Sequence, residues 1–244
     1  MHEDNFLDFM IFNIIGAAAM LLFTSYLDVK RREVEDKIWL IFGVTGVALQ
    51  AYEILNGYTN ILSLGISLTL ATIIGLGLFF FGFYGGADGK ALIALAILVP
   101  QFNPHVGLYT IAPLMVLTNG VLISILLPVS ILILNGARLL RHQEIFEGFT
   151  EPFHRKLLAC LLGFKQTGKP RDFQFIMEKT VKQEDGLTQK KFDFSLMHDE
   201  FETESGTWVT PGIPLLVFFT IGYFVMLWYG DLVIALIEFL ARTL

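Results

Sequence analysis

Residues 61–99 run ILSLGISLTLATIIGLGLFFFGFYGGADGKALIALAILV and contain two charged residues, Asp88 and Lys90. A helix of roughly 20 apolar residues crosses a bilayer core, because its backbone groups are hydrogen-bonded within the helix. Ile61–Phe83 has that length, whereas Asp88–Val99 is shorter and stops at Pro100. The stretch therefore predicts a membrane-spanning helix and a short second one, joined by a glycine-rich turn that carries an acid.

The rest of the chain has the same character. Hydrophobic residues make up 54% of the 244 and charged residues 16%, with a mean hydropathy of +0.62. Soluble domains carry about 25% charged residues. Four more apolar runs are Phe6–Leu27, Ile38–Leu55, Gly107–Leu134 and Pro214–Leu240. We predict an α-helical polytopic membrane protein with six transmembrane helices and a small α+β cytoplasmic subdomain between helices five and six. The last run is interrupted at Gly230, so a span to Tyr229 followed by an amphipathic surface helix is the alternative.

Lysine and arginine predict the orientation, since loops retained in the cytoplasm carry an excess of them. The basic residues near span ends are Lys30, Arg31, Arg32, Lys37, Lys90, Arg138 and Arg141. The loops 56–60 and 101–106 contain none. We therefore expect a multi-pass protein of the cell membrane with both termini outside, and with Asp28 and Asp88 at the cytoplasmic face.

Three regions follow from this layout. Residues 1–134 hold helices one to five, 135–207 form a soluble cytoplasmic insertion, and 208–244 hold helix six and the tail. Within the insertion, apolar and polar residues alternate in 172–181 and again in 190–197, with Asp185-Gly186 between them. This pattern predicts a β-hairpin. One or two short helices, broken at Pro152, are expected in 143–162.

Several classes of function are excluded by composition. A single cysteine, Cys160, allows no internal disulfide framework and no CxxC zinc module. The net charge of −6, without a basic stripe, does not favour nucleic-acid binding. The chain has no HExxH and no GxSxG motif. We expect no cofactor and no metal.

The two aspartates nearest the span ends are the candidates for chemistry. Asp28 follows the first apolar run and taken alone is typical of a solvated charged loop. Asp88 lies among Gly85, Gly86 and Gly89, which permit unusual backbone angles or close approach of another backbone. An N-capping role is the simpler explanation of Asp88, but it does not explain the glycines. Two neighbouring carboxyls share a proton, so one can activate a water while the other polarises a scissile carbonyl.

The stretch Gly85-Gly86-Ala87-Asp88-Gly89-Lys90 resembles the GxGD motif of the membrane aspartyl proteases that process type IV prepilins and archaeal preflagellins. The segment from Asp28 to Ile38-Trp39 resembles that family's first catalytic segment. Asn119-Gly120 and Trp208–Pro214 resemble the archaeal preflagellin peptidases, so the resemblance covers the whole chain. It implies that Asp28 and Asp88 are catalytic and that Gly85, Gly86, Gly89 and Lys90 support the active-site turn. Ala87 replaces the second glycine of the motif, which predicts a right-handed or extended backbone there.

The resemblance also implies a substrate. Family members remove a short basic leader from preflagellin or type IV prepilin subunits at the cytoplasmic membrane face. Bacterial members that also N-methylate the new terminus often carry a cysteine-rich loop, so the lone Cys160 suggests an archaeal-type aspartic endopeptidase without methyltransferase activity. We further hypothesise that five acids attract the basic leader, although a solvated linker is the plainer interpretation. They are Asp193, Asp199, Glu200, Glu202 and Glu204.

Two other functions remain as alternatives. A presenilin-like or signal-peptide-peptidase-like protease would carry a Pro-Ala-Leu motif, which is absent from this sequence. A small proton-coupled transporter would carry acids near mid-membrane and an internal repeat. Three further acids are expected at the outer membrane interface: Glu53, Asp231 and Glu238. Five glycines are expected to mark close helix packing: Gly16, Gly43, Gly65, Gly75 and Gly77.

Overall fold

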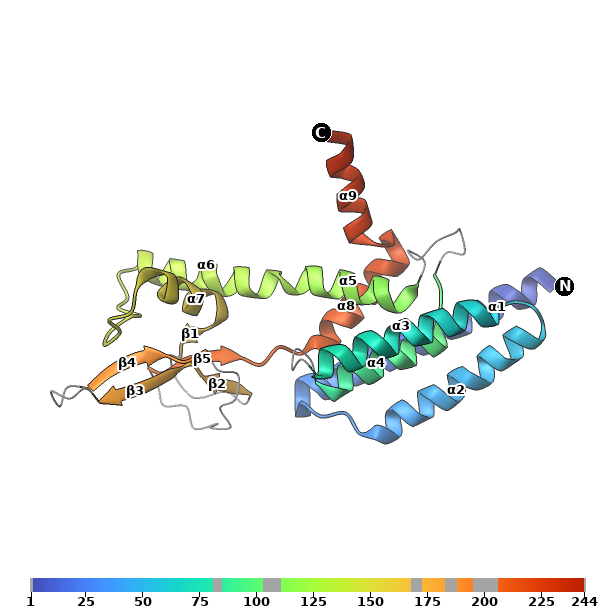
Figure 1. The fold of residues 1–244 in the computed structure, drawn as a ribbon, viewed down its shortest axis with the longest axis horizontal. Helices are drawn as coiled ribbons and strands as arrows, with labels where there is room; N and C mark the ends of the chain where they lie inside the picture. The colour runs from blue at the N-terminus through green and yellow to red at the C-terminus, as the bar shows by residue number, and fades with distance from the viewer. Residues whose placement is uncertain are drawn as a thin grey trace. The chain divides into compact units, whose positions relative to one another are not determined.

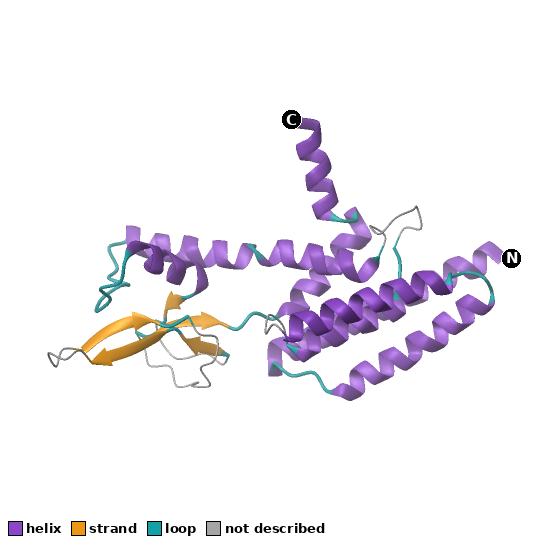
Figure 2. Cartoon of the chain, in the orientation of Figure 1, coloured by secondary structure: helices purple, strands orange, loops and turns teal. Residues whose placement is uncertain are grey.

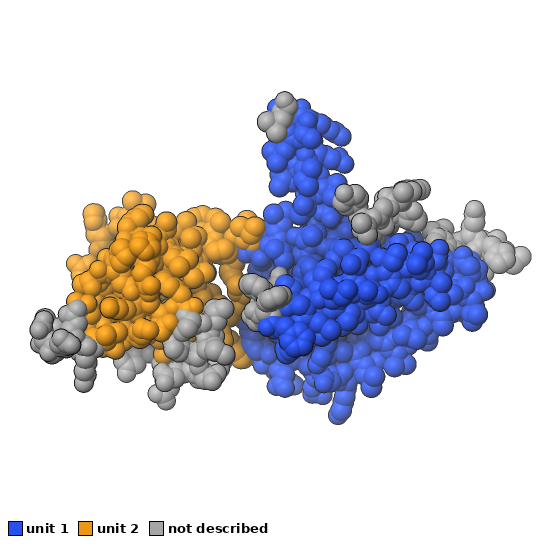
Figure 3. Space-filling view, in the orientation of Figure 1, with its two compact units in different colours: residues 1–124, 214–244 blue, residues 125–213 orange. Residues whose placement is uncertain are grey.

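The structure is a computed structural model that describes residues 2–80, 85–102, 111–167, 173–182, 188–194 and 206–243. Helices dominate these residues, and the strands are confined to one region (Figure 2). The chain forms two compact units, coloured blue and orange in Figure 3. Unit 1 comprises 1–124 and 214–244, and unit 2 comprises 125–213.

Unit 1 is a helical bundle. Its described helices are α1 (His2–Arg31), α2 (Asp36–Leu55), α3 (Ile61–Phe80), α4 (Gly86–Leu98), α5 (Ala112–Ser124), α8 (Leu215–Tyr229) and α9 (Leu232–Thr243). The short α4 packs against α1, α2 and α3, and Figure 1 shows these four helices alongside one another. Much of α4 is buried, including Leu92 and Leu95, whereas α2 and α3 expose many apolar side chains. A helix that is apolar all round is expected either in a core or against lipid.

The lengths of the helices bear on the predicted six spans. Four helical stretches are long and apolar enough to cross a membrane: Phe9–Arg31, Asp36–Leu55, Ile61–Phe80 and Ala112–Leu140. The bent pair α8 and α9 makes up to five. The helix α4 has 13 residues, about 20 Å at 1.5 Å per residue, which is short for a span, as the sequence indicated. The several apolar helices indicate a membrane protein, and the count of six stays a prediction.

The interruption predicted in the last apolar run is a bend of 55° between α8 and α9. Gly230 ends α8 with φ +86°, a left-handed conformation that glycine adopts at low cost. Asp231 then caps α9, because its side chain accepts the backbone N–H of Val233 at 2.8 Å. Asn119 from α5 holds both sides of the bend: its amide donates to the Gly230 carbonyl, and its side-chain oxygen accepts the N–H of Leu232.

Unit 2 combines two helices with short strands. They are α6 (Leu126–Leu140), α7 (Phe153–Leu162), β1 (Phe164–Lys165), β2 (Gln174–Ile176), β3 (Glu178–Lys182), β4 (Thr188–Phe192) and β5 (Trp208–Pro211). The predicted hairpin is confirmed as the antiparallel pair β3–β4, with Glu178 opposite Phe192. The first part of the predicted strand is separate: β2 pairs with β5, which also pairs with β1. Of the helices expected in 143–162, α7 forms directly after Pro152, and the preceding residues form turns.

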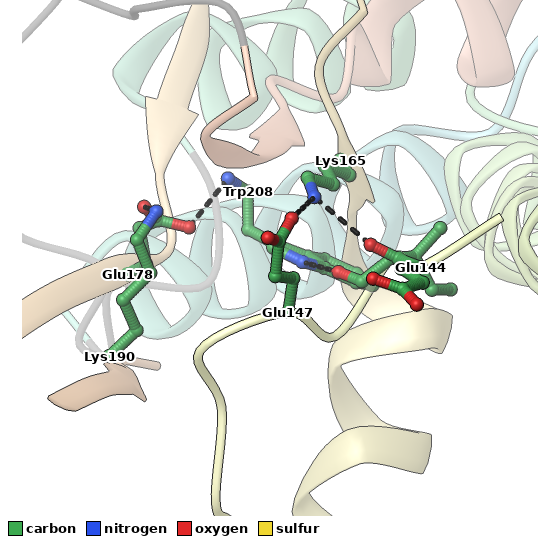
Figure 4. A network of polar contacts seen from close by, with 7 residues as sticks. Glu144, Glu147, Lys165, Glu178, Lys190 and Trp208 are labelled. Carbon is green, nitrogen blue, oxygen red and sulfur yellow. Dashed lines mark hydrogen bonds and ion pairs between the residues drawn. The ribbon is translucent and has the colours of Figure 1, made fainter.

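Trp208 is the centre of unit 2 and is fully buried. Its indole N–H donates to the Ile145 carbonyl at 2.8 Å, and its backbone N–H donates to Glu178, which also binds Lys190 (Figure 4). The rings of Phe146, Phe149 and Phe192 surround it. A buried aromatic with its polar atom satisfied gives this small unit a well-defined core.

Candidate active site

Asp28 lies in the last turn of α1 and is partly buried. Its carboxylate accepts a hydrogen bond from the backbone N–H of Leu216, the second residue of α8, and the charge of Arg32 also acts on it. The first N–H groups of a helix have no partner within the helix, and they carry the positive end of its dipole. The start of α8 therefore supplies a donor to Asp28.

Asp88 is the third residue of α4, and its side chain is buried. Its Oδ2 accepts the backbone N–H of Gly85 at 3.0 Å, and its own N–H donates to the Gly85 carbonyl. An acid at this position that reaches back to the residue before the helix forms one half of a capping box. The N-capping role considered from the sequence is therefore wrong in position, because Gly85 is the N-cap residue and Asp88 caps from the third position. Neither role explains the burial of Asp88.

The two acids are brought together in unit 1. Their helices α1 and α4 pack against each other, and the charge of Asp28 acts on the Asp88 carboxyl. From the basic loops, the sequence predicted only that both aspartates lie at the same membrane face, and it left their separation open. Two carboxyls within electrostatic reach, one of them buried, favour a state in which they share a proton.

The sequence suggested two roles for the glycines of the turn, unusual backbone angles and close approach of another backbone. Gly85 is extended at φ −72°, and Gly86, Ala87 and Gly89 are helical with no positive φ. The predicted right-handed or extended backbone at Ala87 is thus confirmed, and unusual backbone angles at the glycines are not found. Gly89 instead permits close approach: a Cβ there would lie 3.2 Å from the Gly75 carbonyl oxygen of α3. The prediction that glycines of the spans mark close helix packing is confirmed for Gly75. It is wrong for Gly43, Gly65 and Gly77, where an added Cβ meets nothing within 4 Å among the described residues.

Hydroxyl groups that the sequence analysis did not identify connect α1 to α8 beside the site. Ser25, one turn before Asp28, donates to the Leu216 carbonyl at 2.7 Å and lies 2.6 Å from the Thr220 hydroxyl. Thr220 is also within reach of the carbonyls of Leu21 and Leu216. Leu216 therefore contacts both residues: its backbone N–H donates to Asp28, and its carbonyl accepts a hydrogen bond from Ser25. The spacing of Ser25 from Asp28 was a visible signal, but nothing in the sequence pointed to Thr220.

The remaining predicted site residues lie further out. Lys90 forms an ion pair with Asp36 at the start of α2, and both side chains are exposed. Such surface pairs contribute about 0–1 kcal/mol. Asp193 forms an ion pair with Lys179 at 3.0 Å and is mostly buried. The other four acids of the leader-attraction hypothesis, Asp199, Glu200, Glu202 and Glu204, lie outside the described residues, so the hypothesis stays a prediction.

The side chains that commonly bind metals are dispersed among the described residues. Across the ranges that the structure describes, no three side chains of His, Cys, Asp and Glu converge. Cys160 is buried in unit 2, and burial raises the pKa of its thiol to about 11. A thiol in that state is a poor nucleophile.

Comparison with known proteins identifies the family of this chain. The type IV leader peptidase family matches residues 15–137, which include both aspartates. The preflagellin peptidase of Methanococcus maripaludis is 31% identical, with 91% of this chain and 96% of that protein aligned. Those of Methanocaldococcus jannaschii and Methanococcus voltae are each 28% identical over 93% of this chain, covering 97% and 99% of their own lengths. This chain belongs to the type IV leader peptidase family.

Proposed function

We propose that this protein is a membrane aspartic endopeptidase that removes the leader peptide from preflagellin-like subunits. The observation that carries the proposal is that Asp28 and Asp88 lie on α1 and α4, two helices of unit 1 that pack against each other, and that each acid has a main-chain N–H donor. The family match and the three preflagellin peptidases support the substrate class. Type IV prepilins, which the family resemblance also suggests, are the second substrate to test.

The two acids have different surroundings, which suggests a division of labour. Asp88 is the more buried, and burial favours a neutral carboxyl. Asp28 is also partly buried, but the charge of Arg32 and the Leu216 N–H beside it offset part of the cost of burying a carboxylate there. We assign Asp28 as the general base that activates water, and Asp88 as the protonated acid that polarises the scissile carbonyl.

The place of cleavage follows from charge. Every lysine and arginine between residues 1 and 137 lies in 30–37 or at Lys90. Lys90 pairs with Asp36, so these segments meet at the end of the bundle that carries the aspartates. Because basic loops are retained in the cytoplasm, we place the site at the cytoplasmic face of the cell membrane and both termini outside.

Cleavage without methylation is the second part of the proposal. The chain has one cysteine, and Cys160 is buried in unit 2. A cysteine-rich loop of the kind carried by the bacterial cleaving and methylating enzymes has no counterpart in this sequence. We therefore expect the mature subunit to keep an unmethylated amino terminus, which mass spectrometry of the product measures directly.

The decisive test is cleavage of a preflagellin and of a prepilin in membranes by wild type, Asp28→Asn and Asp88→Asn. Each substitution keeps the size of the side chain and removes its acid chemistry, so both should abolish cleavage. Glu33→Gln is the matched control, because Glu33 is an exposed acid in the same loop as Arg32. Full activity in either aspartate variant would refute the mechanism. Loss of wild-type activity on chelation would point to a metal enzyme instead.

A further inference from the structure

Unit 1 contains a buried carboxylate far from the two aspartates. Glu53 lies near the end of α2, and its side chain is buried, not interfacial as expected from the sequence. Asn13 of α1 donates to its Oε1 at 2.6 Å, and Thr59 donates to its Oε2 at 2.6 Å. Asn13 is about 22 Å along α1 from Asp28, at 1.5 Å per residue, so this cluster lies at the opposite end of the bundle.

Among the described residues, no cation pairs with the charge of Glu53. No lysine or arginine occurs in 38–89 or 91–137. Within the described ranges, no ion pair includes Glu53. Burying a carboxylate costs several kcal/mol unless it is paired or bound to a metal, and two hydrogen bonds from neutral donors offset only part of that. An ionisable residue within an apolar bundle therefore indicates a missing partner.

Two amide oxygens beside Glu53 are also without a partner. A carboxylate and a carbonyl can only accept, so the amide nitrogens of Asn13 and Gln50 must face Glu53 and the Leu98 carbonyl respectively. The side-chain oxygens of Asn13 and Gln50 are then the amide atoms that point away from these two acceptors. Both oxygens are buried and have no hydrogen-bond partner among the described residues, and the Gln50 side chain is 2% exposed. A buried acceptor left unpaired is unfavourable, because it has lost its hydrogen bonds to water and gained none in the protein.

These groups line one cavity of about 530 Å³. Its wall includes Asn13, Gln50 and Glu53, together with the polar residues Asn60, Ser63 and Gln101. The volume is enough for an ion that keeps several waters, since a water occupies about 30 Å³ in the liquid. Much of the rest of its wall is apolar, with Leu98, Val99 and Phe102 among the lining residues. The cavity thus offers one carboxylate, several amide and hydroxyl oxygens, and room.

We propose that Glu53, Asn13 and Gln50 form a binding site for a hard metal cation, with Ca²⁺ as the ion that fits the donors. Ca²⁺ takes carboxylate and amide oxygens together with water in flexible geometry, whereas the softer transition metals prefer nitrogen or sulfur. A single carboxylate implies weak binding, with a Kd on the order of 0.1–1 mM. The ion joins the ends of α1 and α2, so it stabilises the bundle. The site does not depend on the proposed protease activity.

The test uses the full chain, purified in detergent and stripped with a chelator that is then removed. Equilibrium dialysis against radioactive Ca²⁺ up to about 10 mM measures binding, and tryptophan fluorescence on heating measures Tm. NaCl at matched ionic strength controls for screening. We expect one saturable Ca²⁺ per chain and a Tm that rises with the bound fraction. Absence of saturable uptake, or an equal rise in NaCl, would overturn the proposal.

Variants tie the binding to the cluster. Glu53→Gln should weaken Ca²⁺ binding at least tenfold and abolish the rise in Tm. Gln50→Leu keeps the carboxylate and should weaken binding severalfold, which gives a second readout if Glu53→Gln accumulates poorly. Glu238→Gln, an exposed acid on α9, is the matched control and should bind as wild type does. Unchanged binding in both Glu53→Gln and Gln50→Leu would place the ion elsewhere and sink the assignment.

Discussion

Alanine at Gly75 tests whether the packing of α3 on α4 positions Asp88. A Cβ at Gly75 would lie 3.1 Å from the Cα and 3.2 Å from the carbonyl oxygen of Gly89. Ordinary contacts between carbon atoms are about 3.5–4.0 Å, so the two backbones must separate by about 0.5 Å. Both contacting segments are helix backbone, which cannot move aside as the end of a flexible side chain can. Because Gly89 follows Asp88 directly, the acid moves with it.

The expected effect of Gly75→Ala on the free energy of unfolding combines two opposing contributions, and its effect on kcat is separate. Overpacking costs about 1–3 kcal/mol, and replacing glycine by alanine within a helix gains about 1 kcal/mol, so the free energy of unfolding should fall by about 0–2 kcal/mol. A 1 Å misplacement of a catalytic group costs about 100-fold in rate, so a shift of half that size should lower kcat about tenfold. Activity should therefore fall much more than stability.

The assay is kcat on a preflagellin substrate beside Tm in the same detergent. Gly77→Ala is the matched control in the same helix, because a Cβ there meets nothing within 4 Å among the described residues. It should keep wild-type kcat. If Gly75→Ala stays within twofold of wild type, or Gly77→Ala loses as much activity, then the α3–α4 contact does not set the position of Asp88.

Three further changes test the remaining contacts. Ser25→Ala removes the hydroxyl that holds the α8 carbonyl and should lower kcat about tenfold, with a cost of about 1–2 kcal/mol; Thr24→Val, whose hydroxyl bonds only within α1, should leave kcat near wild type. Gly222→Ala would place a Cβ 2.6 Å from the facing α5 backbone, so the variant should fail to accumulate, whereas Gly43→Ala, with open space among the described residues, should express normally. Trp208→Phe leaves a buried carbonyl unpaired and should destabilise unit 2 by about 1–3 kcal/mol, seen as faster limited proteolysis of that unit.

Some of these contacts were visible in the sequence because their causes are local. Runs of apolar residues gave the helices to within a few residues, since length and hydrophobicity alone decide a span. The hairpin followed from alternation around a turn. The glycines around Asp88 indicated close packing, and Gly75 was its expected counterpart. Each of these features depends on residues that are near one another in the chain.

The features that the sequence did not reveal depend on distant partners. Thr220 meets Ser25 across 195 residues, and a threonine within an apolar run carries no sign of which helix it faces. The strand β2 looked continuous with β3, but its partner β5 lies beyond a long intervening segment. Glu53 seemed interfacial because it is near the end of α2, whereas Asn13 from another helix covers it. Which helices pack together decides each case, and periodicity does not encode it.

The two acids belong to two separately fixed helix pairs. Asp88 belongs to α3 and α4, whose backbones touch at Gly75 and Gly89. Asp28 belongs to α1 and α8, which the hydroxyls of Ser25 and Thr220 hold together. Each pair is rigid at its contact, because backbone packing and buried hydrogen bonds tolerate little displacement. The spacing of the carboxyls is therefore set by how one pair docks on the other through α1 and α4.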